Sequence, residues 1–284
     1  MKLSKIFALL LALCLISSAA CAATFTDAHG NVIELDDSLE AYAAVTLVGA
    51  DNAARQGETN LGDLWADALR WFAVSGEINA AFDEDDVKAG NDRIAVDADH
   101  VVALWNGGNL RADITEGTFG AEALAEVLPF PNKVAVVYMT GAQLLETLEA
   151  ASQGLPYTAE TADACASLMQ VSGLTYTVDT TKAYDALEAY GDHWFTAGSV
   201  SRVSISDVNG QPFDETATYA VVTSNANFNG MDSSYVLKAA AEANEQSAVT
   251  TAVVRDVVFR FIAAELNHQV GEAYAAPQGR LTIL

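Results

Sequence analysis

The 284-residue sequence has little cysteine, little positive charge and no long apolar run. Its three cysteines are too few for a disulfide scaffold. The apolar run from Ile6 to Ile16 is shorter than the about 20 residues of a transmembrane helix. Only 14 Lys and Arg residues stand against 38 Asp and Glu residues, a formal net charge of −24, so no nucleic-acid partner is expected. The hydrophobic fraction of 51% excludes disorder and leaves an acidic globular protein.

The first residues have the pattern of a secretory signal peptide. Two lysines precede the apolar run, and small residues follow it. The Ala20-Cys21-Ala22 sequence predicts cleavage before Ala23, so residues 1–22 form the leader and the mature chain is exported to the periplasm or the exterior. Lipid anchoring at Cys21 is the less favoured alternative, because Ser18 stands where a lipobox prefers an aliphatic residue.

Residues 23–50 are expected to form an N-terminal hairpin extension, and residues 51–284 a domain of their own. Turn residues at His29-Gly30-Asn31 separate two short β-type runs. The sequence T-F-T-D-A-H-G-N-V-I-E-L is similar to the opening hairpin of periplasmic siderophore-binding proteins, and the similarity is confined to this stretch.

The rest of the chain predicts an α+β fold with mixed sheets and flanking helices. A helical stripe of apolar residues runs from Asn60, the predicted cap, to Gly76. Thr140-Gly141-Ala142-Gln143 is a capping box that opens a helix. Asn209-Gly210 predicts a tight turn between a pair of strands. A further helix is expected over Thr250–His268, and strands over Val101–Trp105, Lys133–Met139, Val203–Val208, Tyr219–Thr223 and Arg280–Leu284.

Signatures of catalysis and of metal binding are missing from the sequence. It contains no G-x-S-x-G elbow and no Walker loop, and no histidine has a metal-ligand partner at helical spacing. No catalytic residue, metal or cofactor is therefore predicted. Polar residues beside glycine do stand out at predicted strand ends, in Asn106-Gly107-Gly108-Asn109-Leu110-Arg111 and Asn229-Gly230-Met231-Asp232. Arg111 and Arg55 either bind phosphate or ribose oxygens, as guanidinium groups do, or form surface ion pairs.

Four stretches, in this order, resemble the C-terminal, substrate-binding domain of the 5′-nucleotidase family. They are R-Q-G-E-T-N-L-G-D-L-W-A-D-A-L, W-N-G-G-N-L-R-A-D-I-T-E-G, V-L-P-F-P-N-K-V-A-V-V-Y-M-T-G-A-Q-L-L-E-T-L-E and Q-V-S-G-L-T-Y-T-V-D. The closing P-Q-G-R-L-T-I-L is similar as well, so the resemblance covers Arg55 to Leu284.

The resemblance implies a domain that binds a nucleoside or nucleotide, while a separate N-terminal metallophosphatase domain hydrolyses the phosphate ester. By position, Arg55 and Arg111 would hold phosphate or ribose oxygens, and Asn106 would meet the base edge. Phe130 would stack on the base, and Asp232 would bind the ribose hydroxyls.

The sequence departs from the family pattern in two respects. Ala226 stands where the family has a second stacking aromatic, so that Phe228 or Tyr235 would have to supply it, and Met231 replaces a glycine. The D-x-H and N-H-[DE] metal motifs of the phosphatase domain do not occur before Arg55, so this chain is not expected to hydrolyse by the two-metal mechanism.

Three functions remain open. The first is an exported module that binds a nucleoside or nucleotide. The second is the binding half of a phosphohydrolase that acts with a separate metallophosphatase domain in nucleotide catabolism. The third is a solute-binding or structural protein whose ancestral site has decayed, which the N-terminal hairpin and Ala226 favour.

Overall fold

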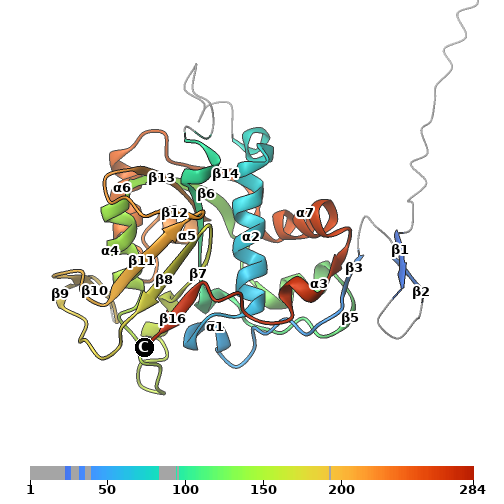
Figure 1. Ribbon diagram of the computed structural model, residues 1–284, viewed down its shortest axis with the longest axis horizontal. Helices are drawn as coiled ribbons and strands as arrows, with labels where there is room; N and C mark the ends of the chain where they lie inside the picture. The colour runs from blue at the N-terminus through green and yellow to red at the C-terminus, as the bar shows by residue number, and fades with distance from the viewer. Residues whose placement is uncertain (1–22, 27–31, 36–39, 83–93, 95, 192) are drawn as a thin grey trace, which may run out of the picture.

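The computed structural model describes residues 23–26, 32–35, 40–82, 94, 96–191 and 193–284 (Figure 1). The predicted leader, residues 1–22, and the predicted turn residues 29–31 lie outside the described residues. Strands β1 (Ala23–Thr26) and β2 (Val32–Leu35) pair antiparallel, in agreement with the predicted hairpin. No helix in the described part of the chain is both long and apolar enough to cross a bilayer.

A five-stranded sheet in the order β14-β6-β13-β4-β7 forms the centre of the fold. Strands β4 and β13 run parallel, and all other neighbours run antiparallel. The three inner strands are buried on both faces, which explains why they read as unbroken apolar runs rather than as alternating ones. The strands span β4 (Val101–Asn106), β6 (Lys133–Thr140), β7 (Met169–Ser172), β13 (Thr218–Ser224) and β14 (Ala248–Val253).

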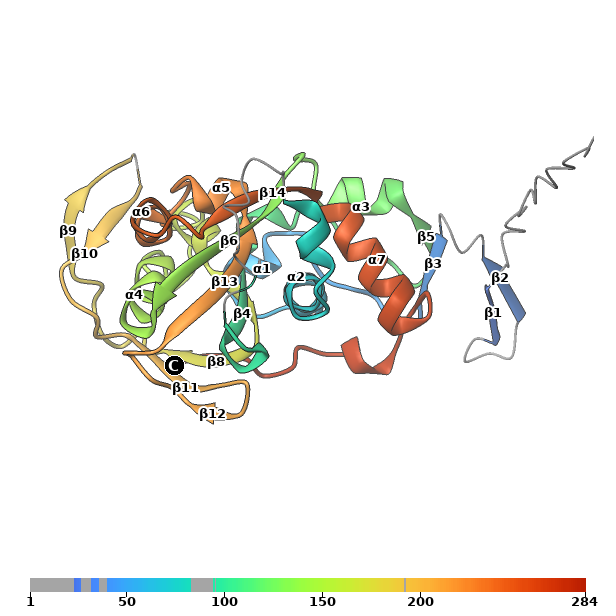
Figure 2. The ribbon, with the colours of Figure 1, turned by 90° about the horizontal axis from the view of Figure 1, so that it is seen from above.

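Helix α2 (Asn60–Val74) covers one face of this sheet, and α7 (Val254–Leu266) packs against α2 on the side away from the sheet (Figure 2). Alternate residues of β4 point to this side, and the Trp105 ring lies 6.3 Å from that of Trp65 on α2. The other face packs against α4 (Gly141–Ala151) and α6 (Tyr235–Ala243). The molecule therefore has two apolar cores, one on each side of the central sheet.

Three smaller sheets surround the central one. A four-stranded sheet, β12-β11-β8-β16, closes the second core. A three-stranded sheet, β15-β3-β5, places residues 40–43 in the packed domain, although the sequence analysis assigned them to the extension. The third is the β9–β10 hairpin. The strands span β3 (Glu40–Ala43), β5 (Gly117–Gly120), β8 (Leu174–Val178), β9 (Ala186–Ala189), β10 (Phe195–Ala197), β11 (Val203–Val208), β12 (Gln211–Pro212), β15 (Gln269–Val270) and β16 (Leu281–Ile283).

Short helices complete the chain. They are α1 (Ala53–Gln56), α3 (Ala121–Val127) and α5 (Asn225–Phe228), with the 3-10 helices η1 (Glu77–Ala81), η3 (Ala98–His100), η4 (Gly107–Asn109), η5 (Ala164–Ser167) and η6 (Glu272–Tyr274).

The predicted starts of α2 and α4 are confirmed to within one residue. The capping box at α4 is present, because the Thr140 hydroxyl accepts a hydrogen bond from the Gln143 amide and the Gln143 side chain accepts one from the Thr140 amide. At α2 the cap is Thr59, not Asn60. The Asn60 side chain instead donates to the carbonyls of Thr46 and Tyr274, and so ties two distant segments together.

Two predictions about these elements are wrong: the partner of the strand over residues 219–223 and the start of the helix before His268. The Asn209-Gly210 turn does form, with both residues in the left-handed region, but it joins β11 to the short β12. Residues 219–223 pair instead with β4 and β6 in the central sheet. The helix predicted over Thr250–His268 begins at Val254, because the β-branched residues before it pair with β6 as strand β14.

Candidate functional site

A cavity of about 580 Å³ lies beyond the ends of the parallel strands β4 and β13, and we call it the β4–β13 pocket. Ligands of α/β sheets bind outside the carboxyl ends of such strands, and the volume lies in the range of small-molecule sites. The lining comes from the loop after β4, the loop before β6 and the chain from α5 to α6. The lining residues are Gly108, Asn109, Arg111, Phe130, Asn132, Ala166, Asn225, Ala226, Asn229, Gly230, Met231 and Asp232.

Asn106 and Asp232 form a fixed polar pair at the pocket. The Asn106 side chain, at the end of β4 and 2% exposed, donates to Oδ2 of Asp232 at 2.8 Å. Asn109 donates to Oδ1 of Asn106 at 2.7 Å and so fixes its orientation. Burial raises the pKa of the Asp232 carboxyl, while Arg55, Arg111 and the bond from Asn106 oppose the shift. The Asp232 carboxyl is thus an oriented acceptor at the edge of the cavity.

Arg111 and Phe130 line the same cavity from two different loops. The guanidinium carbon of Arg111 lies 5.6 Å from the centre of the Phe130 ring, which is 40% exposed. Within the described residues, the Arg111 guanidinium makes no hydrogen bond or ion pair. Burial and the nearby charge of Arg55 lower its pKa, and Asp232 opposes this. Arg111 therefore presents unused donors to the cavity beside an aromatic face.

Arg55 lies behind the pocket rather than on its surface. It belongs to α1 and is 9% exposed. Its Nη1 donates to the Ala162 carbonyl at 2.8 Å and lies 3.6 Å from the Asp163 carboxylate. Its charge nevertheless acts on both Arg111 and Asp232, so it contributes to the potential of the pocket without lining it.

Phe228 is not brought to the pocket. Ala226 lines the cavity, whereas Phe228 packs against the second core. Both residues lie on α5, where two positions correspond to a turn of about 200°, so they face opposite sides of the helix. Tyr235 is committed elsewhere, since its hydroxyl donates to Glu146 and accepts from the Ala197 amide. Among the described lining residues, Phe130 is the aromatic one.

The glycines after β4 make room for protein. A Cβ atom at Gly107 would lie 1.9 Å from the main-chain oxygen of Ala54, and one at Gly108 would lie 2.6 Å from Cβ of Ala166. The Gly107 amide donates to the Leu168 carbonyl at 2.7 Å. Close packing of α1 and η5 against this loop therefore requires both glycines.

The sequence analysis missed several polar residues at the pocket. Asn132 and Asn225 line it, and Asn225 also accepts the Lys133 amide. Tyr190, in a segment without sequence periodicity, contacts Asp232 from outside. These residues belong to none of the strand-end glycine motifs, so no local signal marked them.

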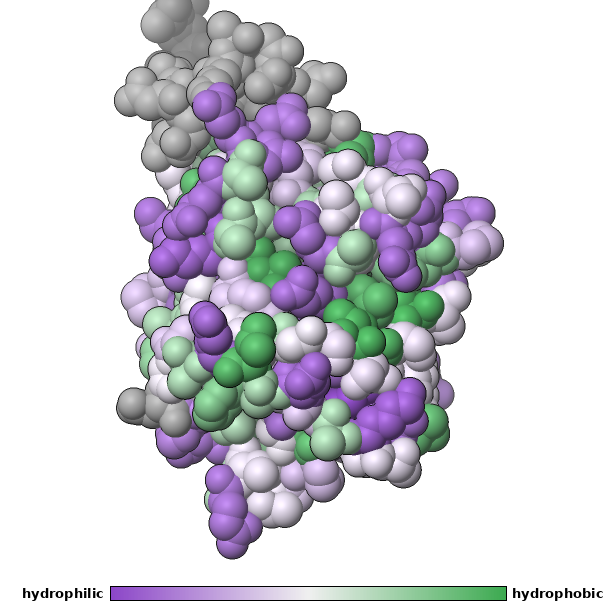
Figure 3. Space-filling model, turned by 90° about the vertical axis from the view of Figure 1, so that its left-hand side faces the viewer, coloured by the Kyte–Doolittle hydropathy of each residue, from purple (hydrophilic) through white to green (hydrophobic). Residues whose placement is uncertain are grey.

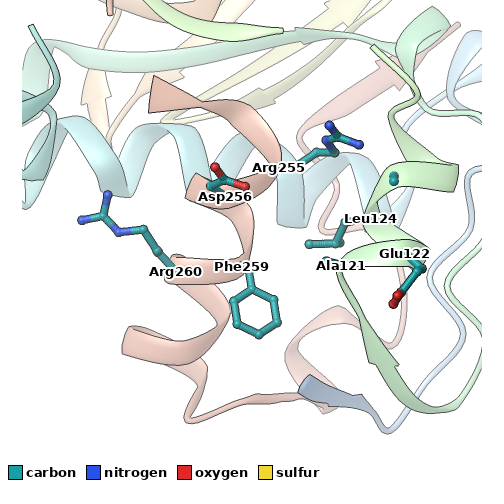
Figure 4. Close-up of a pocket in the computed structure, with 8 residues that line it drawn as sticks. Ala121, Glu122, Leu124, Arg255, Asp256, Phe259 and Arg260 are labelled. Carbon is teal, nitrogen blue, oxygen red and sulfur yellow. The ribbon is translucent and has the colours of Figure 1, made fainter. Parts of the chain in front are cut away.

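A second cavity of about 570 Å³ lies between α3 and α7, and the charged side chains around it do not point toward one another (Figure 4). Leu124 and Phe259 supply apolar surface there, while Arg255 and Arg260 point away from each other. Arg260 is committed to Glu77. Among the described residues, no group of three or more His, Cys, Asp or Glu side chains is arranged to hold a metal ion.

Comparison with known proteins identifies the family of the fold. The family model described as 5′-nucleotidase, C-terminal domain, matches residues 40–239. The chain is similar to a 5′-nucleotidase precursor of Thermus thermophilus, with 28% identity and a TM-score of 0.61, over 86% of this chain and 39% of that one. The NAD nucleotidase of Haemophilus influenzae shares the fold, with 16% identity and a TM-score of 0.56, over 86% of this chain and 38% of that one.

A trifunctional nucleotide phosphoesterase of Bacillus subtilis is 31% identical over 136 residues, which are 48% of this chain and 8% of that protein. The chain thus spans well under half the length of these relatives. The predicted α+β class is confirmed, and the family model covers more than half of the chain. The chain therefore belongs to the 5′-nucleotidase C-terminal domain family.

Proposed function

We propose that this chain is a nucleoside- or nucleotide-binding domain and that the β4–β13 pocket is its binding site. One observation carries the proposal. Arg111, Phe130 and Asp232 come from three separate stretches of the chain and line one cavity, and Asn106, from the same stretch as Arg111, is hydrogen-bonded to Asp232 at its edge. The chain belongs to the 5′-nucleotidase C-terminal domain family, and the resemblance to that family implies that this domain binds the substrate.

Each group has a chemical role in the proposed complex. The exposed face of Phe130 stacks on the base, and Asn106 orients Asp232 to accept hydrogen bonds from the ribose hydroxyls. Arg111 binds the phosphate through its unused donors. An anion there is favoured because it would offset the repulsion between the charges of Arg55 and Arg111, which Asp232 also opposes.

The pocket offers stacking from one side. Because the cavity is lined by Ala226 rather than by a second aromatic residue, and Phe228 packs against the second core, a bound base stacks on Phe130 alone. One base–aromatic contact is worth about 1–3 kcal/mol, so affinity below that of a site with two aromatic walls is expected.

A second candidate is that the chain is the binding half of a phosphohydrolase and acts with a metallophosphatase domain of another chain. The observation that favours it is that the chain spans 39% of the Thermus 5′-nucleotidase precursor. Export belongs to both candidates, since residues 1–22 have the pattern of a signal peptide.

Calorimetric titration of the purified protein with AMP and adenosine tests the proposal. Both ligands are expected to bind, and Arg111→Ala is expected to lower the affinity for AMP more than the affinity for adenosine. Arg255→Ala, at the cavity between α3 and α7, is the matched control and should change neither affinity. If neither ligand binds, nor uridine nor UMP, the proposal is overturned and the decayed-site interpretation takes its place.

The second candidate is tested by phosphate release from AMP in the presence of Mn²⁺. The purified chain should release no phosphate, and a metallophosphatase partner should restore turnover. If the purified chain alone released phosphate and Arg111→Ala abolished this activity, the second candidate would be contradicted.

A further inference from the structure

The β9–β10 hairpin stands at one end of the molecule, beside the chain that leads from α5 to α6 (Figure 2). All four residues of β9 are exposed, so the hairpin has little core of its own. Figure 3 faces this end of the molecule and shows hydrophobic side chains scattered among hydrophilic ones. A few specific contacts therefore determine where the hairpin sits.

Three hydrogen bonds connect the hairpin to the rest of the domain, and two of them reach the segment that carries Asp232. The Tyr190 hydroxyl, at the end of β9, donates to the main-chain carbonyl of Asp232 at 3.2 Å. The Ala197 amide, on β10, donates to the Tyr235 hydroxyl at 3.0 Å. The Tyr190 and Tyr235 rings meet edge to face, 5.4 Å apart. The third contact runs from the Phe195 amide to the Gln153 side chain at 3.0 Å.

The Asp232 segment needs such support. Asp232 has a φ of 54° and Gly230 a φ of 87°; this left-handed region costs a glycine no strain, whereas at Asp232 the Cβ atom makes it less favourable, although Asp adopts it more readily than most residues. Met231 between them is 60% exposed and adds little packing. The Asp232 side chain is held from one side by Asn106, and its main-chain carbonyl is held from the other side by Tyr190.

We infer that Tyr190 is a positioning residue, which holds the left-handed backbone of Asp232 so that its carboxylate faces the ribose of the bound ligand. The inference rests on the proposed function. It makes the β9–β10 hairpin a support of the ligand site. It also predicts that the Tyr190 hydroxyl acts selectively on ligands with ribose hydroxyls.

The test compares Tyr190→Phe with Tyr184→Phe in the full chain. Tyr184→Phe is the matched control, because its hydroxyl donates to the Phe195 carbonyl within the hairpin and does not reach Asp232. Tyr190→Phe keeps the ring contact with Tyr235 and removes one hydrogen bond. The dissociation constant of adenosine should rise roughly 2- to 12-fold in Tyr190→Phe. That of 2′,3′-dideoxyadenosine should stay unchanged, and Tyr184→Phe should affect neither ligand.

A second measurement needs no ligand. Amide hydrogen exchange of residues 229–234 should become faster in Tyr190→Phe and stay as in the wild type in Tyr184→Phe. Unchanged exchange and unchanged adenosine affinity in Tyr190→Phe would overturn the inference. So would equal losses for both ligands, or the same effect in Tyr184→Phe, because these would indicate a general loosening of the hairpin. If the wild type binds no nucleoside, the proposed function fails, and the exchange experiment still decides whether Tyr190 holds Asp232.

Discussion

Two of the groups of arginine and carboxylate side chains in the described part of the domain differ in how completely their hydrogen bonds are used. The first is the β4–β13 pocket, where the Arg111 guanidinium has no hydrogen-bond partner among the described residues. The second, which we call the C-terminal cluster, consists of Glu58, Asp63, Asp67, Tyr274 and Arg280.

In the C-terminal cluster nearly every donor has an acceptor. Arg280 binds Asp67 with two nitrogens, at 2.8 and 2.9 Å, and also donates to the Val171 carbonyl. Asp67 accepts further hydrogen bonds from Tyr274 and Ser172. The cluster joins α2 to the last strand, β16. Both terminal nitrogens of Arg280 donate hydrogen bonds within the protein, unlike those of Arg111. A buried arginine with satisfied donors therefore stabilises the fold, whereas an arginine with free donors at a cavity is available for binding.

The largest expected effect is a difference in the free energy of unfolding between variants of Arg280 and of Arg111. Arg280→Met leaves the largely buried carboxylate of Asp67 without its counterion, and should lower the free energy of unfolding by about 3–5 kcal/mol. Arg111→Met loses only an exposed contact with Phe130, and should change it by less than about 0.5 kcal/mol. Urea unfolding of the two variants measures this, and equal losses would contradict the comparison.

The next effect is the pH dependence of stability. Burial raises the pKa of Asp63 to about 8 and Glu58 adds to the shift, although Arg280 opposes it. In the unfolded chain the pKa of Asp is about 3.9. The folded state therefore holds a proton that the unfolded state loses, so the stability that Asp63 contributes is complete below about pH 4 and is lost as the pH rises through about 8.

Measured by urea unfolding from pH 4 to 8, this contribution should fall by a few kcal/mol. Asp63→Asn should flatten the profile, and the exposed Asp256→Asn serves as the control that keeps it. A wild-type profile that rises steadily over this range would show that Asp63 is ionised in the folded state.

Removal of the free arginine should affect binding rather than folding. Arg111→Ala is expected to weaken the binding of AMP by about 1.5–3 kcal/mol, the range for a hydrogen bond to a charged group. The binding of adenosine should weaken less, because adenosine has no phosphate. Calorimetry of both ligands checks this, and equal losses would assign Arg111 a purely structural role.

The smallest expected effect concerns the aromatic wall. Phe130→Ala should weaken AMP and adenosine alike, by about 1–3 kcal/mol, because stacking involves the base alone. Replacement of Phe228, which packs in the core, should instead lower stability and leave the ratio of the two affinities unchanged. A selective loss of AMP in Phe130→Ala would indicate that the ring acts mainly by orienting Arg111.

Local patterns predicted much of the fold. The stripe of apolar residues in α2 and the capping box of α4 act within one or two helical turns, so the sequence contains the information they need. Residues 250–253 show the opposite case. They precede a real helix, and only pairing with β6, more than a hundred positions earlier in the chain, makes them a strand.

For the pocket, the residue types and motifs of the sequence marked Asn106, Arg111, Phe130 and Asp232, and the resemblance to the family gave them roles. Only the tertiary structure decided which arginine is free, because the partners of Arg55 and Arg280 come from segments distant in sequence. It also decided that Ala226, and not Phe228, faces the cavity, and that Tyr190 supports Asp232. Composition, periodicity and caps depend on neighbours along the chain, whereas hydrogen-bond satisfaction and the direction of a side chain depend on neighbours in space.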